Sequence, residues 1–164
     1  MEYTIVFLPL FGAILSGFFG NYIGDRNSEI ITSLLVTISA ILSFLVLYEV
    51  NINQYQDNII IATWINSGSL DVNWSMKIDS LSAVMLVVVT SVSSLVHIYS
   101  IGYMSHDPHK PRFMAYLSLF TFAMLMLVTS DNFLQLFFGW EGVGLCSYFL
   151  IGFWFKKEKA NAAA

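Results

Sequence analysis

Five apolar segments, each close to the length that crosses a bilayer, constrain the fold of this chain more than any other feature of its sequence. A spanning helix needs about 20 predominantly apolar residues, because that length covers the hydrocarbon core. The segments are residues 3–23, 30–50, 81–103, 113–129 and 133–155, of which the fourth is the shortest. We therefore predict an all-α polytopic membrane protein with about five transmembrane helices.

The composition agrees with a membrane protein and excludes a soluble enzyme. Of the 164 residues 57% are hydrophobic and 11% are charged, and the mean hydropathy is +0.70. A soluble domain typically carries about 25% charged residues. Cys146 is the single cysteine, which excludes an internal disulfide and a cysteine cluster. Glu2 stands where a signal peptide needs a basic region, so we interpret residues 3–23 as a retained first span.

The positions of lysine and arginine predict the orientation of the spans. In a five-span arrangement six basic residues fall on one side of the membrane and only Lys77 falls on the other. Because basic loops stay in the cytoplasm, we expect the N-terminus outside and the tail, residues 156–164, in the cytoplasm. The six residues are Arg26, Lys110, Arg112, Lys156, Lys157 and Lys159.

The one long connection, residues 51–80, is then on the outer face. It separates two N-terminal helices within residues 1–50 from three helices within residues 81–155. Apolar and polar residues alternate over 59–64 and again over 70–76, with Ser67-Gly68-Ser69 between them. This pattern predicts a short β-hairpin between the second and third helices. An irregular loop is the alternative.

Several short polar or proline-containing segments predict where helices begin and end. Asp25, Asn27 and Ser28 indicate a turn after the first helix, and Pro108 and Pro111 interrupt the chain between the third and fourth helices. Asp79 and Asp131 are expected to cap helices at the outer face. The short turn 130–132 makes the fourth and fifth helices antiparallel neighbours.

Glu141 is the principal candidate for chemistry. It lies near the middle of the fifth apolar segment, between Gly139, Gly142 and Gly144. An intramembrane carboxylate is costly and usually faces a bundle interior, a water-filled path or a partner charge. Small neighbours let helices approach closely and leave room for water. We therefore expect Glu141 to take part in proton or ion movement, against the alternative of a permanently protonated carboxyl that only joins helices.

His97 is the second candidate, about a turn and a half from the cytoplasmic end of the third helix. Histidine titrates near neutral pH and could pass protons inward. The alternative is a histidine hydrogen-bonded to a backbone carbonyl or to a serine, and the sequence does not decide between these. His106 and His109 flank Pro108 in a loop, where a solvated role is expected. The spacing of the three histidines does not favour a metal site.

Three stretches of the chain together resemble a known family. They are residues 64–85, with Asp79; residues 96–104, with His97; and residues 131–153, which contain Gly-Trp-Glu-Gly-Val-Gly-Leu-Cys-Ser-Tyr. In this order they resemble the N-terminal part of chain 5, the bacterial L subunit, of proton-translocating NADH:quinone oxidoreductase (respiratory complex I).

The resemblance implies a membrane-arm subunit of an enzyme, with an antiporter-like proton-channel module beginning in residues 81–155. Glu141 would match the family's essential membrane glutamate, which pairs with a lysine on a later helix. The resemblance also implies neighbouring antiporter-like subunits as partners. No cofactor is expected in this chain, since NADH, FMN, iron–sulfur clusters and quinone belong to other subunits. No nucleic-acid partner is expected.

Family members have well over a dozen helices, so this chain is expected to be a fragment, a truncated product or one part of a split protein. Alone it should not pump, because the partner lysine lies beyond residue 164. The expected location is a bacterial inner membrane. Two alternatives remain: a fragment of the large subunit of a multisubunit cation/proton antiporter, and a non-functional truncated remnant.

Overall fold

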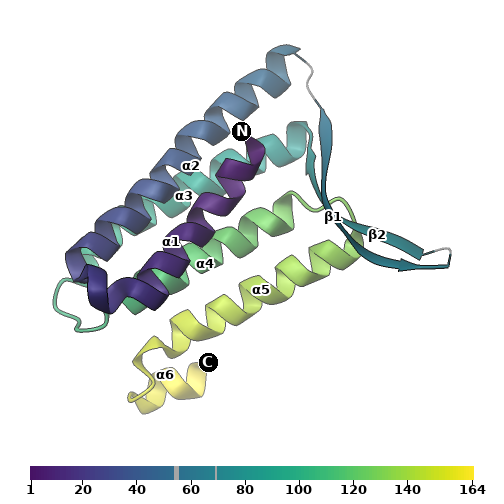
Figure 1. The fold of residues 1–164 in the computed structure, drawn as a ribbon. Coiled ribbons are helices and arrows are strands. Elements are labelled where there is room, and N and C mark those ends of the chain that lie inside the picture. The colour runs from purple at the N-terminus through teal and green to yellow at the C-terminus, as the bar shows by residue number, and fades with distance from the viewer. Residues whose placement is uncertain (54–55, 69) are drawn as a thin grey trace.

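The computed structural model describes residues 1–53, 56–68 and 70–164 of the chain (Figure 1). Five of its helices are long and apolar enough to cross a membrane. These helices, together with a two-stranded antiparallel hairpin, confirm the predicted fold class. In chain order the elements are α1 (Glu2–Ile23), α2 (Asp25–Asn53), β1 (Asp57–Ser67), β2 (Leu70–Ile78), α3 (Ser80–Tyr103), α4 (Lys110–Val128), α5 (Phe133–Ile151), the 3-10 turn η1 (Gly152–Trp154) and α6 (Glu158–Ala163).

Helix α4 is the central element of the bundle. It contacts α1, α2, α3 and α5, while α1 and α3 both pack against α2 as well. Helix α5 packs chiefly along α4 and forms one side of the bundle (Figure 1). Only 17% of its most apolar stretch is buried, compared with 33–39% for the other four long helices. Most of the surface of α5 is therefore free of contact with the described residues.

Hydroxyl groups join the helices inside the bundle. Thr37 of α2 and Ser94 of α3 are hydrogen-bonded at 2.8 Å, and so are Ser43 and Thr90. The Ser16 hydroxyl on α1 donates to the carbonyl of Pro111 on α4 at 2.7 Å. In an apolar environment such hydrogen bonds hold helices together, because there is no hydrophobic driving force between them.

The hairpin is longer than the sequence pattern predicts and excludes the irregular-loop alternative. Its register runs from the pair Asp57 and Ile78 to the pair Ser67 and Leu70, with shifts between Ile60/Ala62 and Thr63/Ile65. Gly68 has φ +61°, a left-handed conformation that glycine adopts at no steric cost. Ser69, also expected in the turn, lies outside the described residues.

The expected starts of α2 and α4 are wrong. Helix α2 begins at Asp25 rather than at residue 30, because Gly24 with φ +86° makes the reversal by itself. Asp25, Asn27 and Ser28 are therefore helical. Pro111 does not interrupt the chain; it lies in the first turn of α4. Proline fits there because its missing N–H would have had no intrahelical partner.

The two expected caps have different outcomes. The Asp79 carboxylate accepts a hydrogen bond from the Ser82 amide at 2.8 Å, and the Ser82 hydroxyl accepts one from the Asp79 amide at 2.7 Å, which confirms a capping box on α3. Asp131 is not a cap. Asn132 caps α5 by accepting from the Gln135 amide at 2.9 Å. Asp131 instead accepts a hydrogen bond from the Asn58 side chain at 2.8 Å.

Candidate functional site

Glu141 lies near the middle of α5 on an exposed part of its surface. No hydrogen bond or ion pair to its carboxylate forms within residues 1–53, 56–68 and 70–164. The carboxylate thus lies midway along a helix of membrane-spanning length, which the rest of the described bundle covers on one side only. In a bilayer, a charge at such a position is costly until a partner, water or a proton compensates it.

Glycines set how closely α5 approaches α4. A Cβ atom at Gly139 would lie 2.8 Å from the Leu127 Cα atom, so the two backbones are in contact there. One at Gly142 would lie 3.3 Å from the Ala123 Cβ atom, whereas one at Gly144 would have nothing within 4 Å. The expected close approach therefore holds for Gly139 and Gly142 and is wrong for Gly144 among the described residues. Because Glu141 is two residues from Gly139, its side chain points away from α4.

The face of α5 that carries Glu141 is apolar and exposed. Residues three, four or seven positions from Glu141 share its face of the helix. They include Leu134, Phe138, Leu145 and Tyr148, whose side chains are 42–54% exposed. A single carboxylate in a wide apolar surface is typical of a helix that meets a further partner or a hydrated path in the membrane.

The start of α5 is fixed by a residue that sequence reasoning did not single out. Gln135 is fully buried. Its Oε1 atom accepts a hydrogen bond from the Ser75 amide at 3.0 Å, and its Nε2 atom donates to the Ser75 carbonyl at 2.7 Å. Asn132 adds a hydrogen bond to the Asn73 carbonyl at 2.8 Å. The polar residues at 130–135 could have indicated a cap, but nothing in the sequence indicates their partners on β2.

His97 lies fully buried between α3 and α4. Its Nδ1 atom is 2.8 Å from the Ser93 carbonyl oxygen, which accepts only if Nδ1 carries the proton. Its Nε2 atom is 3.0 Å from the Ser118 Oγ atom and accepts from that hydroxyl in the same tautomer. Ser93 in turn hydrogen-bonds Thr121 on α4. These are the carbonyl and serine contacts that the non-relay alternative predicts, and they are also a connected polar series.

The structure does not bring the two candidates together. His97 faces α4 through Ser118, whereas Glu141 projects from α5 away from α4. No continuous series of hydrogen bonds joins them within the described part of the chain. A proton path between them would need water or further protein.

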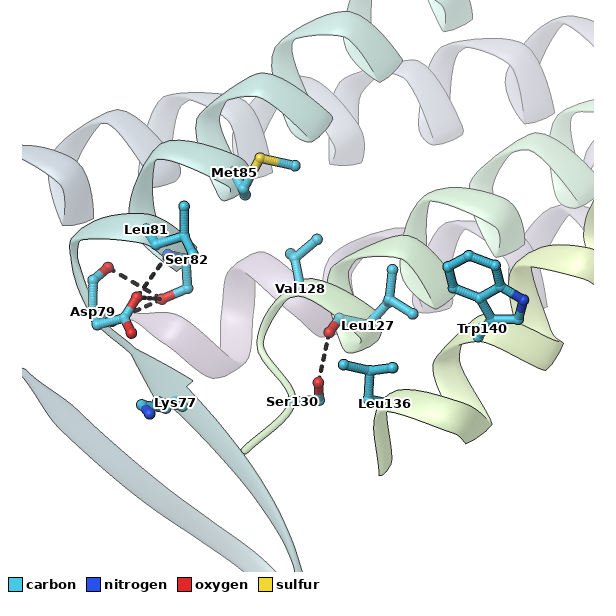
Figure 2. A pocket seen from close by; sticks show the side chains of 10 residues that line it. All are labelled: Lys77, Asp79, Leu81, Ser82, Met85, Leu127, Val128, Ser130, Leu136 and Trp140. Atoms are coloured by element: carbon cyan, nitrogen blue, oxygen red, sulfur yellow. Dashed lines mark hydrogen bonds between the residues drawn. The ribbon is translucent and has the colours of Figure 1, made fainter. Parts of the chain in front are cut away.

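A cavity of about 480 Å³ lies at the hairpin end of the bundle (Figure 2), and neither Glu141 nor His97 lines it. It is bounded by the end of β2, the start of α3, the end of α4 and the first half of α5. Lys77 lies at its β2 edge and Trp140 on its α5 side (Figure 2).

No group of three or more His, Cys, Asp or Glu side chains that could hold a metal ion occurs in the residues described.

Comparisons with known proteins agree on one family. Residues 64–114 match the family model described as NADH-ubiquinone oxidoreductase (complex I), chain 5 N-terminus. Residues 130–164 match the one described as NADH:quinone oxidoreductase/Mrp antiporter, transmembrane. NADH-ubiquinone oxidoreductase chain 5 of Arabidopsis thaliana is 57% identical over 164 residues, which is 100% of this chain and 24% of that protein.

Two further relatives are also named NADH-ubiquinone oxidoreductase chain 5. Chain 5 of Phytophthora infestans is 55% identical over 161 residues, covering 98% of this chain and 24% of that protein. Chain 5 of Talaromyces marneffei is 54% identical over 164 residues, covering 100% of this chain and 25% of that protein. The chain thus spans about a quarter of the length of the curated relatives it matches.

Five membrane-length helices and an end hairpin define a polytopic membrane protein, and the match of residues 130–164 assigns it to the antiporter-like class. Within that class the chain belongs to the complex I chain 5 family and corresponds to the N-terminal portion of its members.

Proposed function

We propose that this chain is part of a membrane subunit of NADH:ubiquinone oxidoreductase and contributes to proton translocation coupled to electron transfer from NADH to quinone. The observation that carries the proposal is Glu141, a carboxylate without a described partner on the apolar face of α5. The relatives named above support the enzyme assignment over a multisubunit cation/proton antiporter, because all three carry the name NADH-ubiquinone oxidoreductase chain 5.

The position of Glu141 suits a group that gains and loses a proton. The contact at Gly139 places α5 against α4, and the open space at Gly144 leaves room beside the carboxylate for water or a second helix. A cationic partner is expected from a part of the longer family protein. Such a partner would compensate the carboxylate's charge within the membrane.

The test is Glu141→Gln in the complete subunit, assembled in its enzyme and reconstituted in vesicles. Glutamine keeps the volume and hydrogen-bonding capacity but cannot carry the proton. We expect NADH oxidation to lose most of its coupled proton movement while assembly is retained. Glu2→Gln, at the end of α1, is the matched control and should pump normally. Unchanged proton movement in Glu141→Gln would exclude the relay role.

We also propose that His97 takes part as a proton-handling group at the far end of α3. Its support is the connected series of Ser93, His97, Ser118 and Thr121. His97→Gln should slow proton translocation, and Ser91→Ala is the control, since the Ser91 hydroxyl has no hydrogen bond among the described residues. Normal pumping with His97→Gln would leave this histidine a purely structural role.

The protein is a multi-pass membrane protein. We propose that the hairpin lies on the outer side of the membrane and that the opposite end faces the inner compartment, where loops rich in lysine and arginine are retained. Six basic residues gather at that end, and Lys77 alone lies at the hairpin. The relatives named above come from eukaryotes, which favours a mitochondrial inner membrane over the expected bacterial one. Other membrane-arm subunits of the enzyme are the proposed partners, and NADH, FMN, iron–sulfur clusters and quinone are proposed to bind elsewhere in it.

A further inference from the structure

Two cavities lie next to one another along the seam of α3 and α4. The first is the cavity at the hairpin end that Lys77 and Trp140 border (Figure 2). The second, of about 320 Å³, lies further along the seam and is lined almost entirely by apolar side chains. Met85 borders both, and we call the two adjoining cavities together the α3/α4 groove. The deeper lining includes Val88, Val92 and Val96 of α3 and Leu117, Phe120 and Met124 of α4.

From Leu81 to Val96 the α3/α4 groove extends about 22 Å, because a helix rises 1.5 Å per residue. Half of a bilayer with its headgroups is about 20–22 Å thick. The groove therefore has the depth of one leaflet, with its polar mouth at the membrane surface and its apolar part in the hydrocarbon region.

The deeper cavity is small. It follows α3 from Met85 to Val96, a length of about 16 Å. A helix segment of that length, with its side chains, fills roughly 1,300–1,800 Å³, several times the 320 Å³ of the cavity. The deeper cavity is thus too small to enclose a helix, and an extended hydrocarbon chain is a thinner occupant.

Its lining also differs from that of a helix–helix contact. Membrane helices pack through small residues and through hydrogen-bonding side chains. Here the surface is made of valine, leucine, methionine and phenylalanine, and its two hydroxyl residues, Ser93 and Thr121, already hydrogen-bond each other. Nothing polar in the deeper groove is left for a docking helix.

The mouth of the groove provides a positive charge. Lys77 is exposed and forms no ion pair with any described residue. The nearby Asp79 carboxylate is held by the Ser82 amide and hydroxyl as the cap of α3 (Figure 2). The Trp140 indole lines the same cavity from the middle of α5, away from Lys77 (Figure 2).

We propose that the α3/α4 groove binds one phospholipid, whose phosphodiester contacts Lys77 and one of whose acyl chains lies along Val88, Val92 and Val96. The inference does not rest on the proton-translocation proposal. Neither Glu141 nor His97 lines the groove, although Ser93 and Thr121, which belong to the hydrogen-bonded series around His97, do.

Native mass spectrometry of the full chain, purified in mild detergent and supplied with dioleoylphosphatidylglycerol, tests this. One retained lipid is expected, bound about fivefold more weakly by Lys77→Ala, while the control Lys156→Ala at the opposite end binds as wild type. Val92→Trp should fill the groove and abolish retention. Its control, Leu95→Trp, lies on α3 outside the groove at a 69% exposed position and should keep the lipid.

Three results would overturn the proposal. One is undiminished retention by Val92→Trp, with Val88→Trp as a second variant if the first does not fold by circular dichroism. Another is equal weakening by Lys77→Ala and Lys156→Ala, which would indicate only general attraction to anionic lipid. The last is a cysteine at position 92 that crosslinks to a neighbouring polypeptide in the complete enzyme, with no lipid retained, which would assign the groove to a protein segment.

Discussion

The side-chain amide of Gln135 makes two hydrogen bonds to the backbone of Ser75, at 3.0 and 2.7 Å, and so attaches α5 to the hairpin through a fully buried contact. The Lys77 amide adds a hydrogen bond to the Thr129 carbonyl at 2.8 Å, just before α5 begins. Because α5 is otherwise covered mainly by α4, these contacts fix the end of the helix that carries Glu141.

Replacing Gln135 by Leu should loosen the hairpin. The change leaves the amide and carbonyl of Ser75 buried without partners, which costs about 1–3 kcal/mol. Hydrogen–deuterium exchange of residues 70–78 should become faster, and the chain should unfold at lower temperature. Phe133→Leu, at an 88% exposed position on the same helix, is the control. Equal exchange in both variants would contradict the attachment.

Gly139→Ala should separate α5 from α4. The added methyl group would lie 2.8 Å from the Leu127 Cα atom and 2.9 Å from its backbone nitrogen, neither of which can rotate away. We expect a loss of about 1–3 kcal/mol in the free energy of unfolding. Gly144→Ala has open space in a helix interior, where alanine is favoured over glycine, so it should raise the free energy of unfolding by up to about 1 kcal/mol. Denaturant titration in detergent distinguishes the two, and equal stabilities would contradict the close approach.

Asp79 should make the stability depend on pH. The Ser82 amide that donates to its carboxylate holds the pKa of Asp79 below the ordinary 3.8, although partial burial opposes this. A lowered pKa means that the stabilisation is complete above the ordinary value and is lost as the pH falls through the lowered one. Asp79→Ala should cost about 1 kcal/mol at neutral pH. The difference in the free energy of unfolding between Asp79→Ala and the wild type should disappear in strong acid. If the difference stays constant with pH, the charge of Asp79 does not contribute to stability.

Lys110→Met should destabilise the bundle end opposite the hairpin. The Lys110 Nζ atom is 3.9 Å from Oε1 of Glu29, whose side chain is only 6% exposed and accepts no hydrogen bond at that oxygen from the described residues. Removing this cation leaves a buried carboxylate with only the weaker influence of Arg26, at a cost of about 1–3 kcal/mol.

Adding Glu29→Gln to Lys110→Met should recover most of that stability, since no charge is then left buried. Lys156→Met, an exposed lysine near the same end, is the control for loss of positive charge alone. Thermal unfolding of the wild type, Lys110→Met, the double variant and Lys156→Met in one detergent measures the effect. A double variant no more stable than Lys110→Met would show that the ion pair is not the source of the loss.

Local sequence patterns predicted much of this protein correctly because they act over a few residues. Apolar length predicted the five spans, alternation predicted the hairpin, and Asp79 followed by Ser82 is a capping sequence in itself. The errors at Asp25 and Pro111 arise because several neighbouring residues can mark one boundary. Here Gly24 makes the reversal before α2, and Pro111 lies in the first turn of α4. At Asp131 a distant contact decides, because its carboxylate accepts a hydrogen bond from Asn58 on β1 while Asn132 caps α5.

What the sequence alone determined was the class of protein and the presence of Glu141, since composition and spacing suffice for both. Only the tertiary structure decided which way that carboxylate points, because the contact of Gly139 with Leu127 sets the rotation of α5 about its axis. The same holds for the neighbours of His97 and for the role of Gln135. Their partners are 21 and 60 residues away, and no periodicity encodes a contact over such a distance.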